Sequence, residues 1–141
     1  MQGYFGRPED TAQALRGGWL HSGDLGKVDE DGYVFIVDRV KDMINVAGFK
    51  VYPREVEEVL FTHRAVKEAA VVGMPDALYG EQVKAFVVAQ SGVDVDPDGL
   101  IAYCRERIAE FKVPRAVELV EALPKSPTGK VLKRELRGDP L

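Results

Sequence analysis

The sequence has 141 residues, of which 45% are hydrophobic and 30% are charged, and its formal net charge is −4. A chain of this length can bury one core but not two well-separated ones, and its net negative charge argues against a general nucleic-acid binder, which needs an excess of Lys and Arg. One cysteine, Cys104, excludes an internal disulfide, and two histidines without clustered carboxylates argue against a protein-bound metal.

Hydropathy and the N-terminal sequence bear on localisation. No apolar run approaches the roughly 18 residues of a membrane helix. The first ten residues, MQGYFGRPED, lack the basic and apolar regions of a secretory signal. We therefore expect a cytoplasmic protein with no integral membrane segment.

The first half of the chain predicts two hairpins after a weakly patterned start. Residues 8–15 are compatible with one or two helical turns that begin near Pro8. A β-hairpin is expected at about 25–38, because an Asp-Gly pair at 31–32 supplies the backbone that a tight turn needs. A second, shorter hairpin is expected at 43–51, around Ala47 and Gly48, where an isolated glycine indicates a positive φ or a close approach.

The second half predicts helices that alternate with strands. Pro53 opens a helix whose apolar residues recur with helical spacing, and the Val- and Ala-rich segments 68–74 and 81–90 are typical of strands. A further helix is expected from Asp96 as far as the Val-Pro pair at 113–114, followed by a short strand at 116–120. This order predicts an α+β fold in which helices pack on one face of a small sheet, preceded by the hairpin segment.

Single residues in four segments have ordinary structural interpretations when each is taken alone. Asp24 between glycines suits a turn, and Gly48 suits a hairpin. Lys130 follows Thr-Gly and precedes a basic tail, which fits a helix cap. It is not part of a nucleotide P-loop, since position 124 is Pro and position 131 is Val. The other basic residues near the C-terminus are interpreted as a solvated helix face: Lys125, Lys133, Arg134 and Arg137.

The four segments together, in this order, resemble the C-terminal portion of the acyl-adenylate-forming enzymes. The matching pieces are GWLHSGDLGKVDEDGYVFIVDRVKDMI, GFKVYPREVE, YGEQVKAFVV and LPKSPTGKVLKREL, and they extend over essentially the whole chain. The form NVAGFKVYPREVEEVL is most similar to bacterial long-chain fatty-acid CoA ligases. The resemblance implies that residues 1–40 are the trailing edge of a large N-terminal domain, and that residues 41–141 are the small C-terminal lid domain.

The resemblance also implies roles for particular residues. Asp24 matches an aspartate that binds the ATP ribose hydroxyls, and Arg39 matches an arginine that reaches the ribose or the phosphates. Lys41 occupies the hinge between the large domain and the small, mobile domain.

Two further segments have implied roles in the two half-reactions. Gly48 matches the glycine beside the channel for the pantetheine of CoA, with Phe49 and Lys50 as its neighbours. Lys130 matches the catalytic lysine that reaches the carboxylate and the α-phosphate during adenylation. An ammonium between two anions that react with one another offsets their repulsion and stabilises the charge of the transition state.

The implied parent reaction converts ATP, a fatty acid and CoA into acyl-CoA, AMP and pyrophosphate, with Mg²⁺ assisting. The phosphate loop and acyl tunnel of the family are not in this sequence, so we expect the chain alone to be inactive. One alternative is a stand-alone binding or regulatory module that pairs with a separate nucleotide-binding subunit. Another is the lid of an aryl-CoA ligase or of a peptide-synthetase adenylation domain. Exposed strands at 19–38 would also allow a homodimer.

Overall fold

The structure, a computed structural model, describes residues 1–138 and divides the chain into two compact units, the first being Met1–Lys41 and the second beginning at Asp42. The first unit contains α1 (Pro8–Ala14), a 3₁₀ turn, β1 (Asp24–Val28) and β2 (Val34–Arg39). Helix α1 begins at Pro8, as the sequence predicts, because proline is tolerated at the first helical position.

Strands β1 and β2 form the predicted antiparallel hairpin, and an aspartate shapes its turn. Asp29 Oδ1 accepts hydrogen bonds from the backbone N–H groups of Asp31, at 3.1 Å, and of Tyr33, at 2.9 Å. Gly32 has a φ of 85°, which an L side chain adopts only with strain. The Asp-Gly pair therefore acts in the structure as the sequence indicates.

The first unit has almost no core of its own. No side chain among residues 1–37 is buried, and large apolar side chains on the hairpin and before it are exposed, including Trp19 (77%) and Val34 (68%). Apolar surface of this extent commonly marks a place where another protein surface packs.

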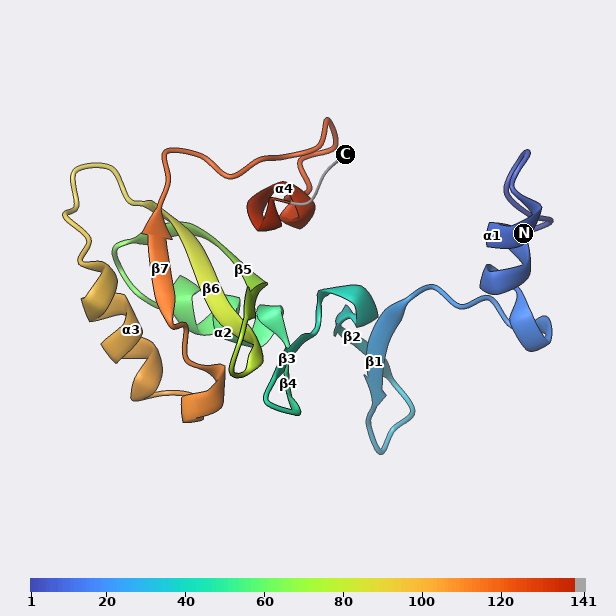
Figure 1. Cartoon of the computed structure of the whole chain (residues 1–141), viewed down its shortest axis with the longest axis horizontal. Coiled ribbons are helices and arrows are strands. Elements are labelled where there is room, and N and C mark those ends of the chain that lie inside the picture. Colours follow the sequence, from blue (N-terminus) through green and yellow to red (C-terminus); the bar gives the residue numbers. More distant parts are fainter. Residues whose placement is uncertain (139–141) are drawn as a thin grey trace. The chain divides into compact units, whose positions relative to one another are not determined.

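The second unit is a five-stranded sheet with helices on both faces (Figure 1). The strand order is β4-β3-β6-β5, and β7 pairs in parallel with β6. Strand β5 is therefore an edge strand along its length. The elements, in chain order, are β3 (Ile44–Val46), β4 (Phe49–Val51), α2 (Pro53–Phe61), β5 (Val66–Asp76), β6 (Gly80–Ala89), α3 (Pro97–Arg105), β7 (Ala116–Leu119) and α4 (Lys133–Arg137).

Two apolar clusters lie on opposite faces of the sheet, because successive side chains of a strand point to opposite faces. On one face, Val71 and Val87 pack with buried residues of α2 and α3. On the other, Val72 and Phe86 pack with Leu136 of α4 and other residues of the C-terminal segment. The expectation of helices on one face only is therefore wrong, since α4 covers the second face. Burial on both faces explains why β5 and β6 are near-continuous apolar runs.

Helix α3 ends at Arg105, well before the predicted end at 113–114. The chain turns extended at Ala109 (φ −60°, ψ 144°) and then forms a 3₁₀ turn at Glu110–Lys112. Tertiary contacts favour this turn: the Phe111 ring stacks on Phe49 at 4.8 Å between centroids, and Lys112 Nζ lies 2.6 Å from Glu55 Oε1. Apolar residues still recur at helical spacing beyond Arg105, because the 3₁₀ turn packs against the same apolar cluster as α3. This recurrence led to the longer helix predicted from the sequence.

Cys104 is fully buried in α3, as expected for a small apolar residue. Burial raises the pKa of its thiol from 9.0 to about 11, and the nearby charge of Arg107 partly opposes this. The neutral thiol is thus favoured by folding. The stabilisation that comes from this shift in pKa is fully present below pH 9, the pKa of the thiol in the unfolded chain. It is lost as the pH rises from about 9 to about 11.

We therefore expect the free energy of unfolding of the wild-type chain to fall relative to that of a Cys104→Ala variant over this pH range, by up to about 1.4 kcal/mol per pH unit. Urea unfolding of both proteins at pH 8, 9, 10 and 11 measures the difference. A difference that stays constant with pH would contradict the assignment, because it would leave only the loss of packing in the variant.

Candidate active-site segments

Asp24 and Arg39 are brought together by the first hairpin. They are direct partners across β1 and β2, and Arg39 Nε lies 3.5 Å from Asp24 Oδ1. Both side chains keep solvent access, at 54% for Arg39 and 33% for Asp24. A carboxylate oriented in this way retains lone pairs that can accept hydrogen bonds from a diol.

Lys41 lies in the 3₁₀ turn Val40–Asp42, directly after β2 and at the last position of the first unit. The backbone N–H of Val40 donates to Gly23 O at 2.8 Å, which ties the start of this turn to the segment before β1. The Lys41 side chain itself is exposed.

Gly48 lies at the turn between β3 and β4, and one hydrogen bond within this hairpin and two to neighbouring segments hold the turn in place. Gly48 N–H donates to Asn45 Oδ1 at 2.9 Å, and Ala47 N–H donates to Tyr79 O at 2.8 Å. The N–H of Asn45 donates to Glu81 Oε2 at 2.8 Å. Positive φ values at Ala47 (50°) and Gly48 (91°) give the two-residue turn whose twist suits a β-hairpin.

The space above Gly48 is open. A Cβ added there would have no other atom within 4 Å. Phe49 is 57% exposed although its ring stacks on Phe111, and Lys50 is exposed. The turn therefore presents bare backbone beside an aromatic ring and an ammonium, a surface that an extended, amide-containing chain can approach closely.

Lys130 lies in a tight hairpin of its own, residues 124–132, which we call the Lys130 loop. Backbone N–H groups of Ser126 and Leu132 donate to the carbonyls of Lys130 and Pro124, both at 2.8 Å. The N–H of Lys130 donates to Ser126 Oγ at 3.1 Å, and Gly129 has a φ of 82°. Thr-Gly before Lys130 thus shapes this loop and does not cap a helix, which begins only at Lys133.

The Lys130 side chain is exposed, and within residues 1–138 its ammonium has no hydrogen-bond or ion-pair partner. An unpaired ammonium on an ordered loop can meet an incoming anion without first breaking another contact. The loop and the β3–β4 hairpin lie apart within the second unit, the loop before α4 and the hairpin beside the far end of the sheet (Figure 1). The second unit therefore presents the Gly48 turn and Lys130 at separate places.

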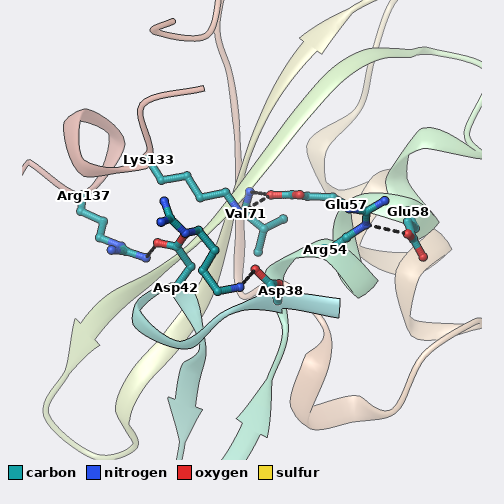
Figure 2. Close-up of polar contacts among 9 residues, drawn as sticks. Asp38, Asp42, Arg54, Glu57, Glu58, Val71, Lys133 and Arg137 are labelled. Atoms are coloured by element: carbon teal, nitrogen blue, oxygen red, sulfur yellow. Dashed lines mark hydrogen bonds and ion pairs between the residues drawn. The ribbon is translucent and has the colours of Figure 1, made fainter. Parts of the chain in front are cut away.

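The interpretation of the basic tail as a solvated helix face is wrong for three residues, of which Lys125 lies before the helix and pairs with Glu68. Lys133 Nζ lies 2.8 Å from Glu57 Oε1, and Arg137 donates to Asp42 Oδ1 at 3.0 Å (Figure 2). The sequence-based interpretation gave Lys133 no partner, and the structure shows that Glu57 is its partner. A signal for it exists in the sequence, because it lies one turn after Pro53 and beside Val56, at the border of the buried stripe of α2.

Metal and membrane features are limited in the part of the chain that the structure describes. Among residues 1–138, no three His, Cys, Asp or Glu side chains gather as metal ligands. In the same residues, no helix combines the length and apolar character needed to cross a bilayer.

The chain has relatives among known families and proteins. The family model described as "AMP-binding enzyme C-terminal domain" matches residues 55–130. A long-chain-fatty-acid–CoA ligase of Bacillus subtilis (strain 168) is 50% identical over 136 residues, which are 96% of this chain and 24% of that protein. A feruloyl-CoA synthase of an Amycolatopsis species is also 50% identical, over 97% of this chain and 28% of that protein.

Solved structures agree with the sequence relatives. The ATP-bound MatB of Rhodopseudomonas palustris superimposes with a TM-score of 0.92 at 40% identity, covering 97% of this chain and 27% of MatB. The chain thus spans about a quarter of the length of the proteins that it matches. The mixed α+β fold and the resemblance seen in the sequence are confirmed, and the chain belongs to the family of AMP-binding enzyme C-terminal domains.

Proposed function

We propose that this chain supplies the lid of an ATP-dependent acyl-CoA ligase, in which Lys130 promotes formation of the acyl-adenylate. One observation carries the proposal: within the family fold, an exposed and unpaired ammonium is held at an internally hydrogen-bonded loop. The reaction brings a carboxylate to the α-phosphate of ATP, and a positive charge between them lowers the barrier to attack.

The remaining site residues have roles in this proposal that follow from their positions. The Asp24 carboxylate binds the ribose hydroxyls and Arg39 orients it. Lys41 lies at the hinge, between the trailing edge of a large domain (residues 1–40) and the lid (41–141). Rotation at the hinge withdraws Lys130 and brings in the Gly48 turn, whose open surface accommodates the pantetheine of CoA.

The acyl group is proposed to be a long-chain fatty acid. Support comes from the form of segment 45–60 and from the relative of Bacillus subtilis. The feruloyl-CoA synthase, equally identical, supports an aromatic acid as the competing substrate. Assay of the complete enzyme with palmitate and with ferulate separates them: preference for ferulate would contradict the fatty-acid assignment.

A chimera tests the lid function itself. This chain would replace the matching 24% of the Bacillus subtilis ligase, leaving the substrate pocket of that protein in place. We expect fatty-acid-dependent exchange of pyrophosphate into ATP by the chimera, and no exchange by the isolated 141-residue chain. Exchange by the isolated chain, or a folded chimera without exchange, would contradict the proposal.

A separate module that pairs with a nucleotide-binding subunit is the second candidate, favoured by the exposed apolar side chains of β2. The same surface would allow a homodimer. To test for a separate module, the isolated chain is added to a Bacillus subtilis ligase that lacks the matching segment. Pyrophosphate exchange restored by this addition would support a separate module. Light scattering of the isolated chain tests for the homodimer, and a monomer at high concentration would contradict it.

A further inference from the structure

Two ion pairs connect the Lys130 loop and its flanking residues to the rest of the second unit, one before Lys130 in the sequence and one after it. Before the tip, Lys125 Nζ lies 2.6 Å from Glu68 Oε2, and both side chains are about a third or more exposed (42% and 31%). After the tip, the pair Lys133–Glu57 is better sheltered, with side-chain exposures of 18% and 15%. The better-sheltered ion pair is thus the one that follows Lys130 in the sequence, at the start of α4.

Helix α4 needs external support, because five residues do not form a stable helix alone. Leu136 packs on the second apolar cluster, and Arg137 pairs with Asp42, the first residue of the unit. The Arg137–Asp42 pair is also sheltered, with side-chain exposures of 22% and 12%. Helix α4 is thereby tied to the residue that follows the proposed hinge.

Glu57 joins elements from the two faces of the sheet. It projects from α2, on one face, while Lys133 projects from α4, on the other. Both meet at the edge strand β5, where Glu57 Oε1 accepts a hydrogen bond from Val71 N–H at 2.8 Å and forms an ion pair with Lys133 Nζ, also at 2.8 Å (Figure 2). The hydrogen bond fixes the carboxylate on the strand, so that the ion pair fixes α4 relative to the sheet.

A sheltered ion pair is weak evidence of stability, because the cost of desolvation offsets the attraction. It does specify geometry, since only one arrangement satisfies both charges. The neighbouring pair Arg54–Glu58 on α2 is different: its side chains are 62% and 66% exposed, and it joins residues of one helix. Glu58 therefore offers a matched control one residue from Glu57.

We infer that Glu57 and Lys133 are positioning residues for Lys130, which they hold by anchoring α4 and the Lys130 loop across the edge of β5. The inference rests on the proposed role of Lys130 in adenylation. Lys133 lies three residues after Lys130, so release of its ammonium frees one side of the loop. A displacement of about 1 Å at a catalytic group can cost on the order of 100-fold in rate, so even partial release is measurable.

Amide exchange of the isolated chain tests the anchoring without reference to activity. Lys133→Met keeps the apolar stem and removes the charge, and it should speed exchange of the Ser126, Lys130 and Leu132 amides about tenfold while β6 amides keep their rates. Lys133→Arg should restore wild-type rates, and Glu58→Gln should leave them unchanged. Unchanged loop exchange in Lys133→Met would overturn the inference. If that variant does not fold, Glu57→Gln, which keeps an acceptor for Val71, tests the same point.

A double-mutant cycle in the chimera tests the connection to Lys130. Lys133→Met should lower kcat for adenylation about tenfold, with the KM values for acid and ATP unchanged, and should cost nothing further in a Lys130→Ala background. An equal cost in both backgrounds would show a merely structural role and overturn the inference. If Lys130→Ala itself leaves adenylation unchanged, the proposed function fails, while the exchange rates still report whether Lys133 anchors the loop.

Discussion

Replacing Lys130 by Ala in the chimera is expected to lower the rate of adenylation by roughly 100- to 1,000-fold, the range for removal of one group that stabilises developing charge. The ammonium has no other partner within residues 1–138, so its loss removes a contact made to substrates and not one that supports the fold. Pyrophosphate exchange measures this half-reaction. Thioester formation from supplied acyl-adenylate should stay within a few-fold of the unmodified chimera.

An exposed lysine elsewhere in the second unit provides the control. Lys67 lies on β5 with an exposed side chain, and Lys67→Ala changes the same net charge without touching the Lys130 loop. Its adenylation rate should match that of the unmodified chimera. If Lys67→Ala and Lys130→Ala lowered the adenylation rate equally, the effect of Lys130 would be one of net charge alone. If Lys130→Ala lowered adenylation and thioester formation equally, the assignment of Lys130 to adenylation would be wrong.

Replacing Gly48 by Leu is expected to have the opposite pattern: thioester formation falls by about 100-fold or more, and adenylation is nearly kept. The side chain would occupy the open space above the turn, where the account places the pantetheine. Supplied acyl-adenylate and CoA measure the affected step, and pyrophosphate exchange measures the other.

Gly48→Ala separates the bulk of the side chain from backbone strain. Any L residue at a φ of 91° is strained, but a lone Cβ meets no atom within 4 Å. Alanine should therefore share the loss of stability, of about 1–2 kcal/mol, and little of the block to CoA. A loss of thioester formation as large in Gly48→Ala as in Gly48→Leu would contradict the channel and indicate a distorted turn.

Local chemistry made much of this fold predictable. The Asp-Gly pair at 31–32, the Ala-Gly pair at 47–48 and Pro53 each determine their own backbone within a few residues, and the structure has the expected hairpins and helix there. The apolar runs of β5 and β6 indicated strands correctly, since both faces are covered.

Long-range contacts account for what the sequence could not predict. Helix α3 ends early because Phe111 and Lys112 find partners in β4 and α2, and such pairings leave no trace in local spacing. Lys133 was interpreted as solvated because its partner lies 76 positions earlier, on the opposite face of the sheet. Pairing of two charges across the edge of β5 depends on the assembled fold.

Among the candidate site residues, too, the sequence predicted the local contacts and did not predict the long-range ones. Asp24 and Arg39 are paired by a hairpin that the sequence predicts, so their meeting follows from local structure. The sequence did not reveal Glu81, which accepts a hydrogen bond from Asn45 beside the Gly48 turn, or Glu57, which pairs with Lys133 of α4, because both contacts depend on the tertiary fold. Their roles in a reaction, like that of Lys130, stay predictions.

The most direct test of the account is a crystal structure of the chimera with palmitate and an ATP analogue that cannot be cleaved between its α- and β-phosphates. We expect Lys130 Nζ to lie within hydrogen-bonding distance, about 2.7–3.2 Å, of the palmitate carboxylate or an α-phosphate oxygen, with the Gly48 turn facing away from the ligands. An ammonium that remains in solvent, far from both ligands in the filled pocket, would contradict it.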